Sequence, residues 1–460
     1  MRLRLLLALG VLLVGTAHAQ AATDACVRPH RWAPATGTTD PRGDLRVIGV
    51  QAKQDVSHVV SYATYAGWVG CLAHDFVDPH KRGTTLVVFN DDIGLMTLAI
   101  GPRGAAVREL ATSPGRAPTG DSEPVGAAAA LGLLNAAYAP QIAAYQALLG
   151  PIDPRKQVFV AATDTMVRSF VATFSALARR EHVYVVASNN MPTWRETTDP
   201  AEVALFGDPE VHDGRAYVAT SSRVTNSTFL WGPDGRLLFR NEKVPLTDLE
   251  QTLLGLDSGP TTGPAAIANA AGIRIGRHRL GFATSLPAFA WGYPFGHRPK
   301  GFRPCEDLSV TYASCMDAQG VDVMVQAEAN PGRWAGQGGA GQWQPTEWMG
   351  SAWRSVADPT LHIRYAVNPF MVGNLLDLPF DGQSAILARG AGRRPVGYIG
   401  ERREPQFLAL APWTVPDGPR ASLEQQSARL APGSGDAQEN DYLETAVYTD
   451  LRADLRSPRS

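Results

Sequence analysis

The 460-residue sequence has little of what marks several large classes of protein. Its formal net charge is −2 and it has no dominant basic segment, so no nucleic-acid partner is expected. It has no glycine-rich phosphate-binding loop, and the segment Gly382–Ile386 lacks the last glycine of a G-x-S-x-G nucleophile turn. The apolar run at the N-terminus is too short to span a bilayer, and the Ala-rich run 126–150 is broken by Asn135, Pro140 and Gln141, so no stable membrane insertion is expected.

The N-terminus has the three parts of a signal peptide. Arg2 and Arg4 form a basic region, Leu5–Val14 is apolar, and Ala17-His18-Ala19 is a small-x-small cleavage site before Gln20. No cysteine stands at the cleavage site itself, which argues against a lipid anchor. We therefore expect residues 1–19 to be removed and the mature protein to be secreted or periplasmic.

Cysteine and lysine are both scarce. The four cysteines are Cys26, Cys71, Cys305 and Cys315, and an even number in an exported protein predicts two disulfides. Three pairings are open: Cys305–Cys315 would close a short loop, and Cys26–Cys71 would fasten the N-terminal extension. Free buried thiols are the alternative. Of five lysines, Lys243 is the one that follows a predicted hairpin.

Strand-like and helix-like patterns alternate through the middle of the chain. Strands are predicted at 45–51, 84–89, 182–188, 279–283, 321–326, 362–368 and 382–388, and a hairpin across the G-P-D-G turn at 232–235. Helices are predicted at 56–68, 161–179 with Asp164 as N-cap, 309–319 and 348–356. This alternation indicates a layered α/β fold. Residues 20–44 suggest an extended lead-in, 45–400 a domain with an insertion at 100–160, and 401–460 a C-terminal tail.

Residues capable of chemistry stand at the ends of three predicted strands. Asp91 and Asp92 follow the strand 84–89, Lys243 follows the hairpin, and Ser285 follows the strand 279–283. Glu250 comes seven residues after Lys243. Hydrolysis of an amide or nitrile needs a nucleophile, a base that activates it, and a cation that stabilises the developing negative charge. These residue types fit that requirement.

The order of these motifs resembles the nitrilase (carbon–nitrogen hydrolase) superfamily. The resemblance covers roughly residues 45–400. It rests on the strand ending in Gln51, the unchanged G-P-D-G turn at 232–235, Lys243 with Leu246, and the segments Gly281–Pro287, Gly320–Gln326, Asn330–Trp334 and Asp381–Ser384. It implies a four-layer α-β-β-α sandwich, a small amide-like substrate or ligand, no metal or organic cofactor, and packing into homo-oligomers.

The resemblance also assigns roles to single residues. Asp91 would be the base, Lys243 would stabilise the tetrahedral intermediate, and Ser285 would be the nucleophile. Residues expected to contact the substrate are Glu250, Asp92, Leu286 and Trp334. The implied activity is hydrolysis of a non-peptide carbon–nitrogen bond, an amide rather than a nitrile.

Two departures from the family's pattern leave alternatives open. The family has cysteine where this chain has Ser285, and a serine hydroxyl yields essentially no anion at neutral pH. The family has glutamate where this chain has Asp91, whose reach is shorter by about 1.5 Å, one C–C bond; Asp92 is the other candidate for that acid. His278 and His297 are alternative bases for Ser285. A pseudoenzyme that binds a small ligand or a protein without turnover is therefore the second hypothesis.

The neighbouring Thr284 is a lesser candidate for the nucleophile. Glu250 has an ordinary explanation as a carboxylate at the start of a helix.

Overall fold

The structure is a computed structural model that describes residues 26, 31–112, 125–333, 344–391, 397–398, 402–403, 406–414 and 420–454. The predicted signal peptide and Trp334 lie outside the described residues.

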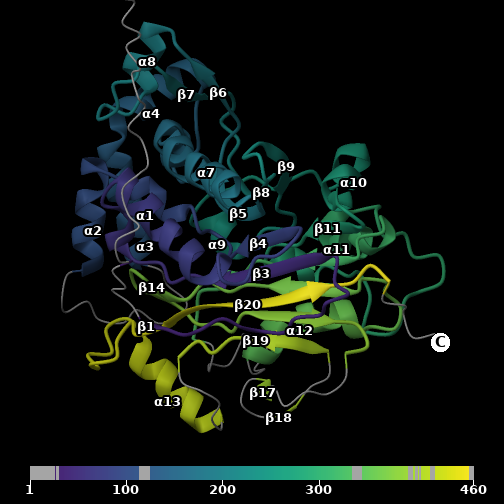
Figure 1. Cartoon of the computed structure of the whole chain (residues 1–460). Helices are drawn as coiled ribbons and strands as arrows, with labels where there is room; N and C mark the ends of the chain where they lie inside the picture. Colours follow the sequence, from purple (N-terminus) through teal and green to yellow (C-terminus); the bar gives the residue numbers. More distant parts are fainter. Residues whose placement is uncertain are drawn as a thin grey trace, which may run out of the picture.

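Two mixed β-sheets carry the fold (Figure 1). The first has the order β1-β20-β3-β4-β5-β8-β9, with β2 also paired to β20. Its strands are β1 (Arg31–Trp32), β2 (Thr36–Gly37), β3 (Leu45–Gln51), β4 (Thr85–Phe89), β5 (Tyr184–Met191), β8 (Thr225–Trp231), β9 (Leu237–Glu242) and β20 (Leu443–Leu451). Strands β3, β4 and β5 run parallel, so their carboxyl ends meet at one edge of the sheet.

The second sheet has the order β10-β11-β12-β13-β16-β19. Its strands are β10 (Ile273–Ile275), β11 (His278–Phe282), β12 (Val323–Val325), β13 (Tyr365–Asn368), β16 (Ala385–Ala388) and β19 (Phe407–Leu410). Here β11, β12 and β13 are the parallel strands. Three two-stranded sheets complete the list: β6 (Trp194–Thr197) with β7 (Ala216–Ala219), β14 (Gly373–Leu375) with β15 (Leu378–Phe380), and β17 (Gly397–Tyr398) with β18 (Arg402–Arg403).

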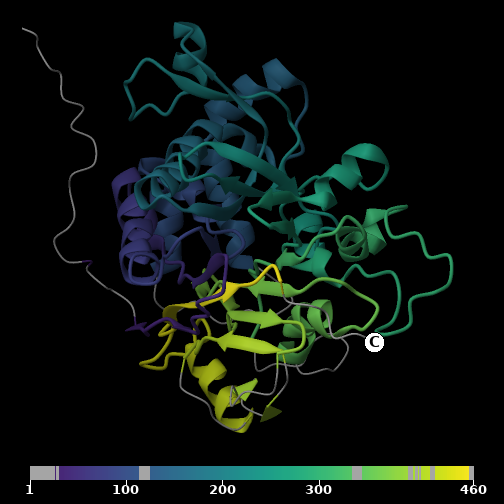
Figure 2. The same cartoon turned by 45° about the vertical axis from the view of Figure 1, so that its right-hand side comes forward.

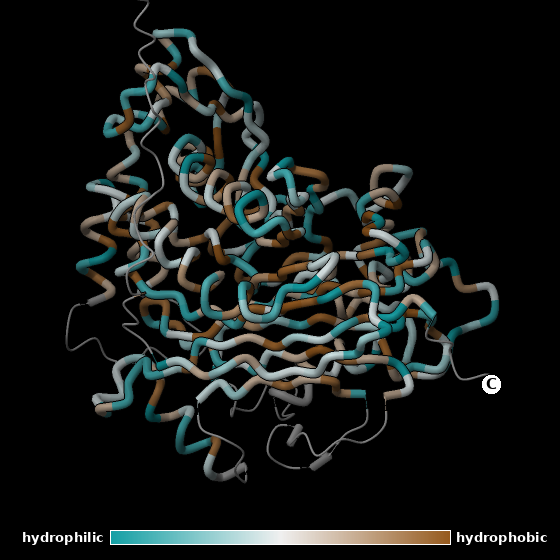
Figure 3. Tube along the Cα trace, viewed as in Figure 1, coloured by the Kyte–Doolittle hydropathy of each residue, from teal (hydrophilic) through white to brown (hydrophobic). Residues whose placement is uncertain are grey.

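The two large sheets face each other across a shared apolar core. Leu86 and Val186 of the first sheet belong to the same buried cluster as Leu280 and Val323 of the second. Each such side chain, fully removed from water, contributes about 1.5–3 kcal/mol. The colouring by hydropathy shows brown stretches along these central strands (Figure 3).

Helices cover the outer face of each sheet. In the first, Phe89 of β4 and Trp231 of β8 pack against Phe174 of α7. In the second, Met324 packs with Met316 of α11 in another buried cluster. The order is therefore helices, sheet, sheet, helices, and the predicted α/β fold class is confirmed. In both views the purple-to-teal part of the chain builds most of the first sheet and the helices on its outer face, and the green to yellow-green part builds the second sheet (Figures 1 and 2).

The α-helices are α1 (Tyr62–Leu72), α2 (Ala105–Thr112), α3 (Val125–Ala137), α4 (Ala139–Leu149), α5 (Gln157–Ala161), α6 (Thr163–Met166), α7 (Ala172–Glu181), α8 (Pro200–Phe206), α9 (Asp248–Thr252), α10 (Gly263–Ala271), α11 (Leu308–Ala318), α12 (Gln344–Ala357) and α13 (Arg420–Leu430). Short 3-10 or π turns are η1 (Val56–Val59), η2 (Ala73–Val77), η3 (Leu95–Ala99), η4 (Pro102–Gly104), η5 (Val167–Val171) and η6 (Leu286–Phe289). In the described part of the chain no single helix is long and apolar enough to cross a membrane. Among the described helices, only α3 and α4 taken together have the length and composition of a membrane span, and the two are bent by 77° relative to each other.

The last strand, β20, lies inside the first sheet rather than in a tail. It pairs with β3 along seven residues, from Thr445 opposite Gln51 to Leu451 opposite Leu45. Its other edge pairs with β1 and β2 of the lead-in. In Figure 1 the yellow arrow of β20 lies directly beside the purple arrow of β3. Residues 443–451 are thus an integral part of the core, contrary to the predicted tail.

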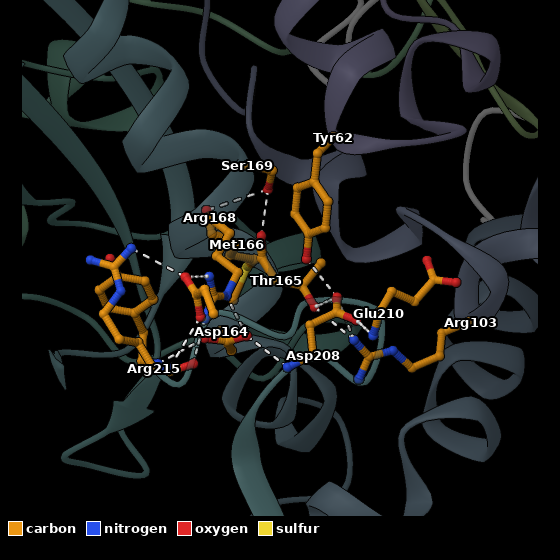
Figure 4. Close-up of polar contacts among 12 residues, drawn as sticks. Tyr62, Arg103, Asp164, Thr165, Met166, Arg168, Ser169, Asp208, Glu210 and Arg215 are labelled. Atoms are coloured by element: carbon orange, nitrogen blue, oxygen red, sulfur yellow. Dashed lines mark hydrogen bonds and ion pairs between the residues drawn. The ribbon is translucent and has the colours of Figure 1, made fainter. Parts of the chain in front are cut away.

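The sequence predicted Asp164 as the N-cap of a helix, and this prediction is wrong. Asp164 is the second residue of α6, and its carboxylate accepts the backbone N–H of Asp208 and pairs with Arg168 at 2.8 Å. Asp208 in turn accepts the hydroxyl of Tyr62 and pairs with Arg103 at 2.8 Å (Figure 4). The cluster fastens the segment after α8 to the helices that cover the first sheet.

All four cysteines are paired in two disulfides. Cys26 pairs with Cys71 of α1, and Cys305 pairs with Cys315 of α11. The prediction of two disulfides is confirmed, and the structure selects one of the three pairings. The second bond fastens the loop that follows Ser285 to the helix packed on the second sheet.

Candidate functional site

Asp91 lies just beyond the end of β4, fully buried, within a shell of hydrogen-bond donors. Its Oδ1 accepts the Ser188 hydroxyl at 2.7 Å and the backbone N–H of Asp92 at 2.8 Å. The Asn226 side-chain amide lies 3.3 Å from both carboxylate oxygens. Burial raises the pKa of Asp91, and the positive charge of Lys243 offsets this only in part. Asp91 is therefore a carboxylate held in place and made more basic than an exposed aspartate.

Lys243 follows β9 directly and lies between two carboxylates. Its Nζ is 2.8 Å from Glu250 Oε1 and 3.7 Å from Asp91 Oδ2, and all three side chains are buried. Burial lowers the pKa of Lys243, but the charges of Glu250 and Asp91 outweigh it and the net pKa lies above the ordinary value. The longer of the two distances belongs to aspartate, the acid with the shorter stem. Lys243 is a permanent buried cation here.

Glu250 fulfils both of the roles that the sequence left open. It is the third residue of α9, where Oε2 accepts the backbone N–H and hydroxyl of Thr247 in a capping box. Its other oxygen, Oε1, accepts Lys243 at 2.8 Å and the Asn226 amide at 3.0 Å. Burial alone would raise the pKa of Glu250, but the charge of Lys243 brings it below the ordinary value. The first turn of α9 thus fixes the Glu250 carboxylate, and this carboxylate holds the Lys243 ammonium group.

Ser285 stands three residues after β11 in a conformation that disfavours side chains. Its φ is 58° and its ψ is −120°, a region that costs a non-glycine residue about 1–3 kcal/mol. Backbone hydrogen bonds hold it there, from Ser285 N to Ala327 O at 3.0 Å and from Ala288 N to Ser285 O at 3.0 Å. Such strain, stored at a turn from strand to helix, is typical of residues that must present a side chain to a substrate.

The Ser285 turn is held against the first sheet. The preceding Thr284 shares a 2.8 Å hydrogen bond with Thr228 of β8. Thr228 is two residues from Asn226 along β8, so both side chains are on the same face of the strand. The strained serine therefore lies on the side of β8 that carries the Asp91–Lys243–Glu250 cluster, and Thr284 is occupied in bridging the sheets.

The sequence analysis missed a second buried acid beside Ser285. The Ser285 hydroxyl donates to Asn330 Oδ1 at 3.0 Å, and Asn330 Nδ2 donates to Glu328 Oε2 at 2.8 Å. Glu328 is fully buried, and burial raises its pKa to about 8, against the opposing effects of Gln326, Lys243 and Asn330. The signal that could have found it is its position, three residues after the apolar strand β12, as Asp91 follows β4.

The other predicted site residues have different surroundings. Asp92 has a φ of 53°, and burial and the charges of Asp91 and Glu250 raise its pKa well above the ordinary range. Asp91, not Asp92, makes the ion pair with the lysine. Leu286 is half-buried and opens η6.

The side-chain hydrogen bond of Ser285 in the described part of the chain goes to Asn330 and not to either histidine. His278 opens β11, and its ring nitrogens lie 2.8 Å from Asp322 and 3.0 Å from Asp44, at the opposite end of that strand from Ser285. His297 is exposed in the loop before α11. In the described part of the chain, no group of three or more His, Cys, Asp or Glu side chains is placed to hold a metal ion.

No protein-family profile and no curated protein matches the sequence. Solved structures do match. An amidase from Nesterenkonia sp. is 15% identical with a TM-score of 0.40, over 85% of this chain and 98% of that one. A carbon–nitrogen hydrolase from Helicobacter pylori G27 is 13% identical with a TM-score of 0.40, over 85% and 93%. A cysteine-to-serine mutant of the Nesterenkonia AN1 amidase, from the nitrilase superfamily, is 14% identical with a TM-score of 0.39, over 84% and 96%.

All three of these matches lie below 25% sequence identity and have TM-scores below 0.5. The activities of these proteins are their own, and the function of this chain rests on the residues of its own site.

Proposed function

We propose that this protein is an exported carbon–nitrogen hydrolase that acts on a small amide through Ser285, Asp91 and Lys243. The observation that carries the proposal is the buried Lys243, held between Asp91 and Glu250 on the side of β8 against which the strained Ser285 turn is bound through Thr284 and Thr228. Burying charges costs several kcal/mol per ion even when they are paired, so a cluster of this kind is an expensive way to fill a core. The two disulfides support export, because such bonds persist in oxidising compartments.

In the proposed reaction Ser285 Oγ attacks the amide carbonyl carbon while its proton passes to Asp91. The carbonyl oxygen becomes an oxyanion, stabilised by the charge of Lys243. Collapse breaks the C–N bond, Asp91 returns the proton to the leaving nitrogen, and ammonia or an amine departs. Water then hydrolyses the ester on Ser285 with Asp91 again as base, which gives a carboxylic acid and restores the serine. The reaction needs no cofactor.

Unpaired acceptors in the site favour a ligand that donates hydrogen bonds. The side-chain oxygens of Asn226 and Gln326 are buried and have no hydrogen-bond partner among the described residues. Leaving such an oxygen unpaired costs about 1–3 kcal/mol. The NH₂ group of a primary amide bound beside Asp91 would satisfy the oxygen of Asn226, and a nitrile, which has no N–H, would not. This asymmetry favours amides over nitriles.

The second candidate is a protein that binds an amide-like ligand without turnover. It is favoured by one contact, the hydrogen bond from Ser285 to the side-chain oxygen of Asn330. An amide oxygen cannot take the proton as a base must, and general-base catalysis needs the base within about 2.6–3.2 Å of the hydroxyl, directly or through one water. Catalysis by Ser285 therefore requires its hydroxyl to turn away from Asn330.

Ammonia release from a panel of small amides and nitriles would test the proposal. The mature protein would be compared with S285A and S285C. Activity of the native protein on amides, lost in S285A, is the expected result. A native protein that is silent while S285C releases ammonia would overturn the serine mechanism and favour the ligand-binding protein. Assembly into homo-oligomers stays a prediction, for which sedimentation equilibrium is the measurement.

A further inference from the structure

Glu328 is a buried carboxyl group whose immediate partners are neutral. Oε1 accepts the Gln326 side-chain amide and Oε2 accepts the Asn330 amide. Gln326 also donates to Ser351 of α12 at 2.7 Å, so the group is packed between β12 and a helix of the outer layer. The charged groups that face it from other elements are Lys243, beyond β9, and Asp91, beyond β4. A carboxylate in such a place is costly unless its charge has a use.

Asn330 connects this acid to the serine in one particular direction. An ionised carboxylate only accepts hydrogen bonds, so Asn330 must present Nδ2 to Glu328 and Oδ1 to Ser285. The serine hydroxyl then donates its proton to Asn330 and not to a base. A protonated Glu328 can donate instead, which allows the Asn330 amide to turn by half a rotation. Nδ2 then donates to Ser285 Oγ, and the serine proton is free.

We propose that Glu328 is a positioning residue that sets the direction of the Ser285 hydroxyl through Asn330, and that protonation of Glu328 releases the hydroxyl for attack. The catalytic consequence rests on the proposed function of Ser285 as nucleophile; the linkage itself does not. In the released state the proton of Ser285 can pass to Asp91, and in the restrained state it cannot. Because burial raises the pKa of Glu328 to about 8, the released state predominates at neutral pH.

The native cysteines make a direct test practicable. All four are in disulfides, so S285C carries a single thiol at the position of the hydroxyl. The S–H stretching band in the infrared moves to lower frequency when the thiol donates a hydrogen bond. In S285C the band should shift downward between pH 6 and pH 8, below the point at which an ordinary thiol, with a pKa of about 8.5, ionises and the band is lost. In S285C/E328Q it should stay at its low-pH position, because glutamine can donate to Asn330 at every pH.

E444Q supplies the matched control. Glu444 is a partly buried acid, and burial raises its pKa to about 7, but its carboxylate accepts hydrogen bonds from Trp68 and Lys53 N, away from Ser285. S285C/E444Q should keep the shift of S285C. A band whose position depends on neither pH nor E328Q would overturn the proposal.

Turnover provides the second readout. Amide hydrolysis by the native protein should fall about tenfold for each pH unit above the transition, while E328Q stays active without that fall. An E328Q variant with the native pH profile, or one that is folded but inactive at every pH, would contradict the positioning role. A native protein without amidase activity whose S285C band still shifts would refute the proposed function and leave the linkage intact.

Discussion

Replacing Lys243 with methionine tests the electrostatics of the site most severely. The substitution K243M keeps most of the volume and removes the charge that lies 2.8 Å from Glu250 and 3.7 Å from Asp91. Removing one partner of a buried ion pair leaves an uncompensated charge and costs about 3–5 kcal/mol. Urea denaturation at neutral pH should show a loss of that size in the free energy of unfolding.

The deficit should depend on pH with a definite sign. In the native protein Lys243 keeps the pKa of Glu250 low, so the stabilisation from Glu250 is complete above its unfolded-state pKa and is lost as the pH falls through the folded-state value. In K243M the pKa values of Asp91 and Glu250 both rise, because burial is no longer offset by the lysine charge. Ionising these buried acids then costs free energy, so this variant loses stability as the pH rises. The difference between the two proteins should therefore be largest at neutral pH and shrink toward about pH 4.

Two further variants make the K243M result interpretable. K300M removes an exposed lysine and should change stability by less than about 0.5 kcal/mol. K243M/E250Q should recover part of the loss, because one of the two stranded charges is gone. A K243M deficit below about 1 kcal/mol, or one that is the same at pH 4 and pH 7, would refute the reasoning.

Three other changes have definite expected outcomes. Folding raises the pKa of Glu328 from 4.5 to about 8, so the native protein should lose up to about 5 kcal/mol of stability relative to E328Q as the pH rises across that window. Urea denaturation of both proteins from pH 4 to 9 measures this loss. Parallel curves of stability against pH for the two proteins would contradict the burial of Glu328. S285G relieves the positive φ and should raise stability by about 1 kcal/mol while abolishing amidase activity, and a lower Tm would contradict the strain. C305S/C315S opens a loop with a sequence separation of 10 and should cost about 3 kcal/mol, and a loss under about 1 kcal/mol would mean that the bond adds little.

Elements with a strong apolar pattern were predictable from the sequence. The strand 45–51 is observed with the same bounds, and the hairpin turns at Gly232–Gly235. β20 was not predicted, because Tyr442 to Leu451 mixes charged and apolar residues and follows a segment rich in glycine and serine. Its strand character comes from pairing with β3 across nearly the whole length of the chain, a tertiary effect that local pattern cannot reveal. Asp164 was misassigned for a related reason, since its carboxylate accepts the backbone N–H groups of Asp208 and Tyr217, which are distant in sequence.

Of the site, only residues placed by a predicted strand end, or by their spacing from such a residue, were predictable from the sequence. Asp91 and Lys243 were selected on that ground, and Glu250 by its spacing of seven residues from Lys243; the lysine contacts both acids. Ser188 and Asn226 complete the Asp91 shell, yet each is an ordinary polar residue in a strand whose role depends on a neighbouring strand. The direction of the Ser285 hydroxyl and its link to Glu328 are details of side-chain rotation, and no sequence pattern encodes them.

Trapping of the acyl intermediate tests the serine mechanism directly. The mature protein would be mixed with a small amide substrate, or with an activated ester of the same acid, quenched in acid during turnover, and measured intact and as peptides by mass spectrometry. The proposed mechanism predicts a mass increase equal to the acyl group, located on Ser285 and absent from S285A. Two results would contradict the mechanism. One is turnover by both S285A and the native protein with no acyl adduct on either, and the other is an adduct on a residue other than Ser285.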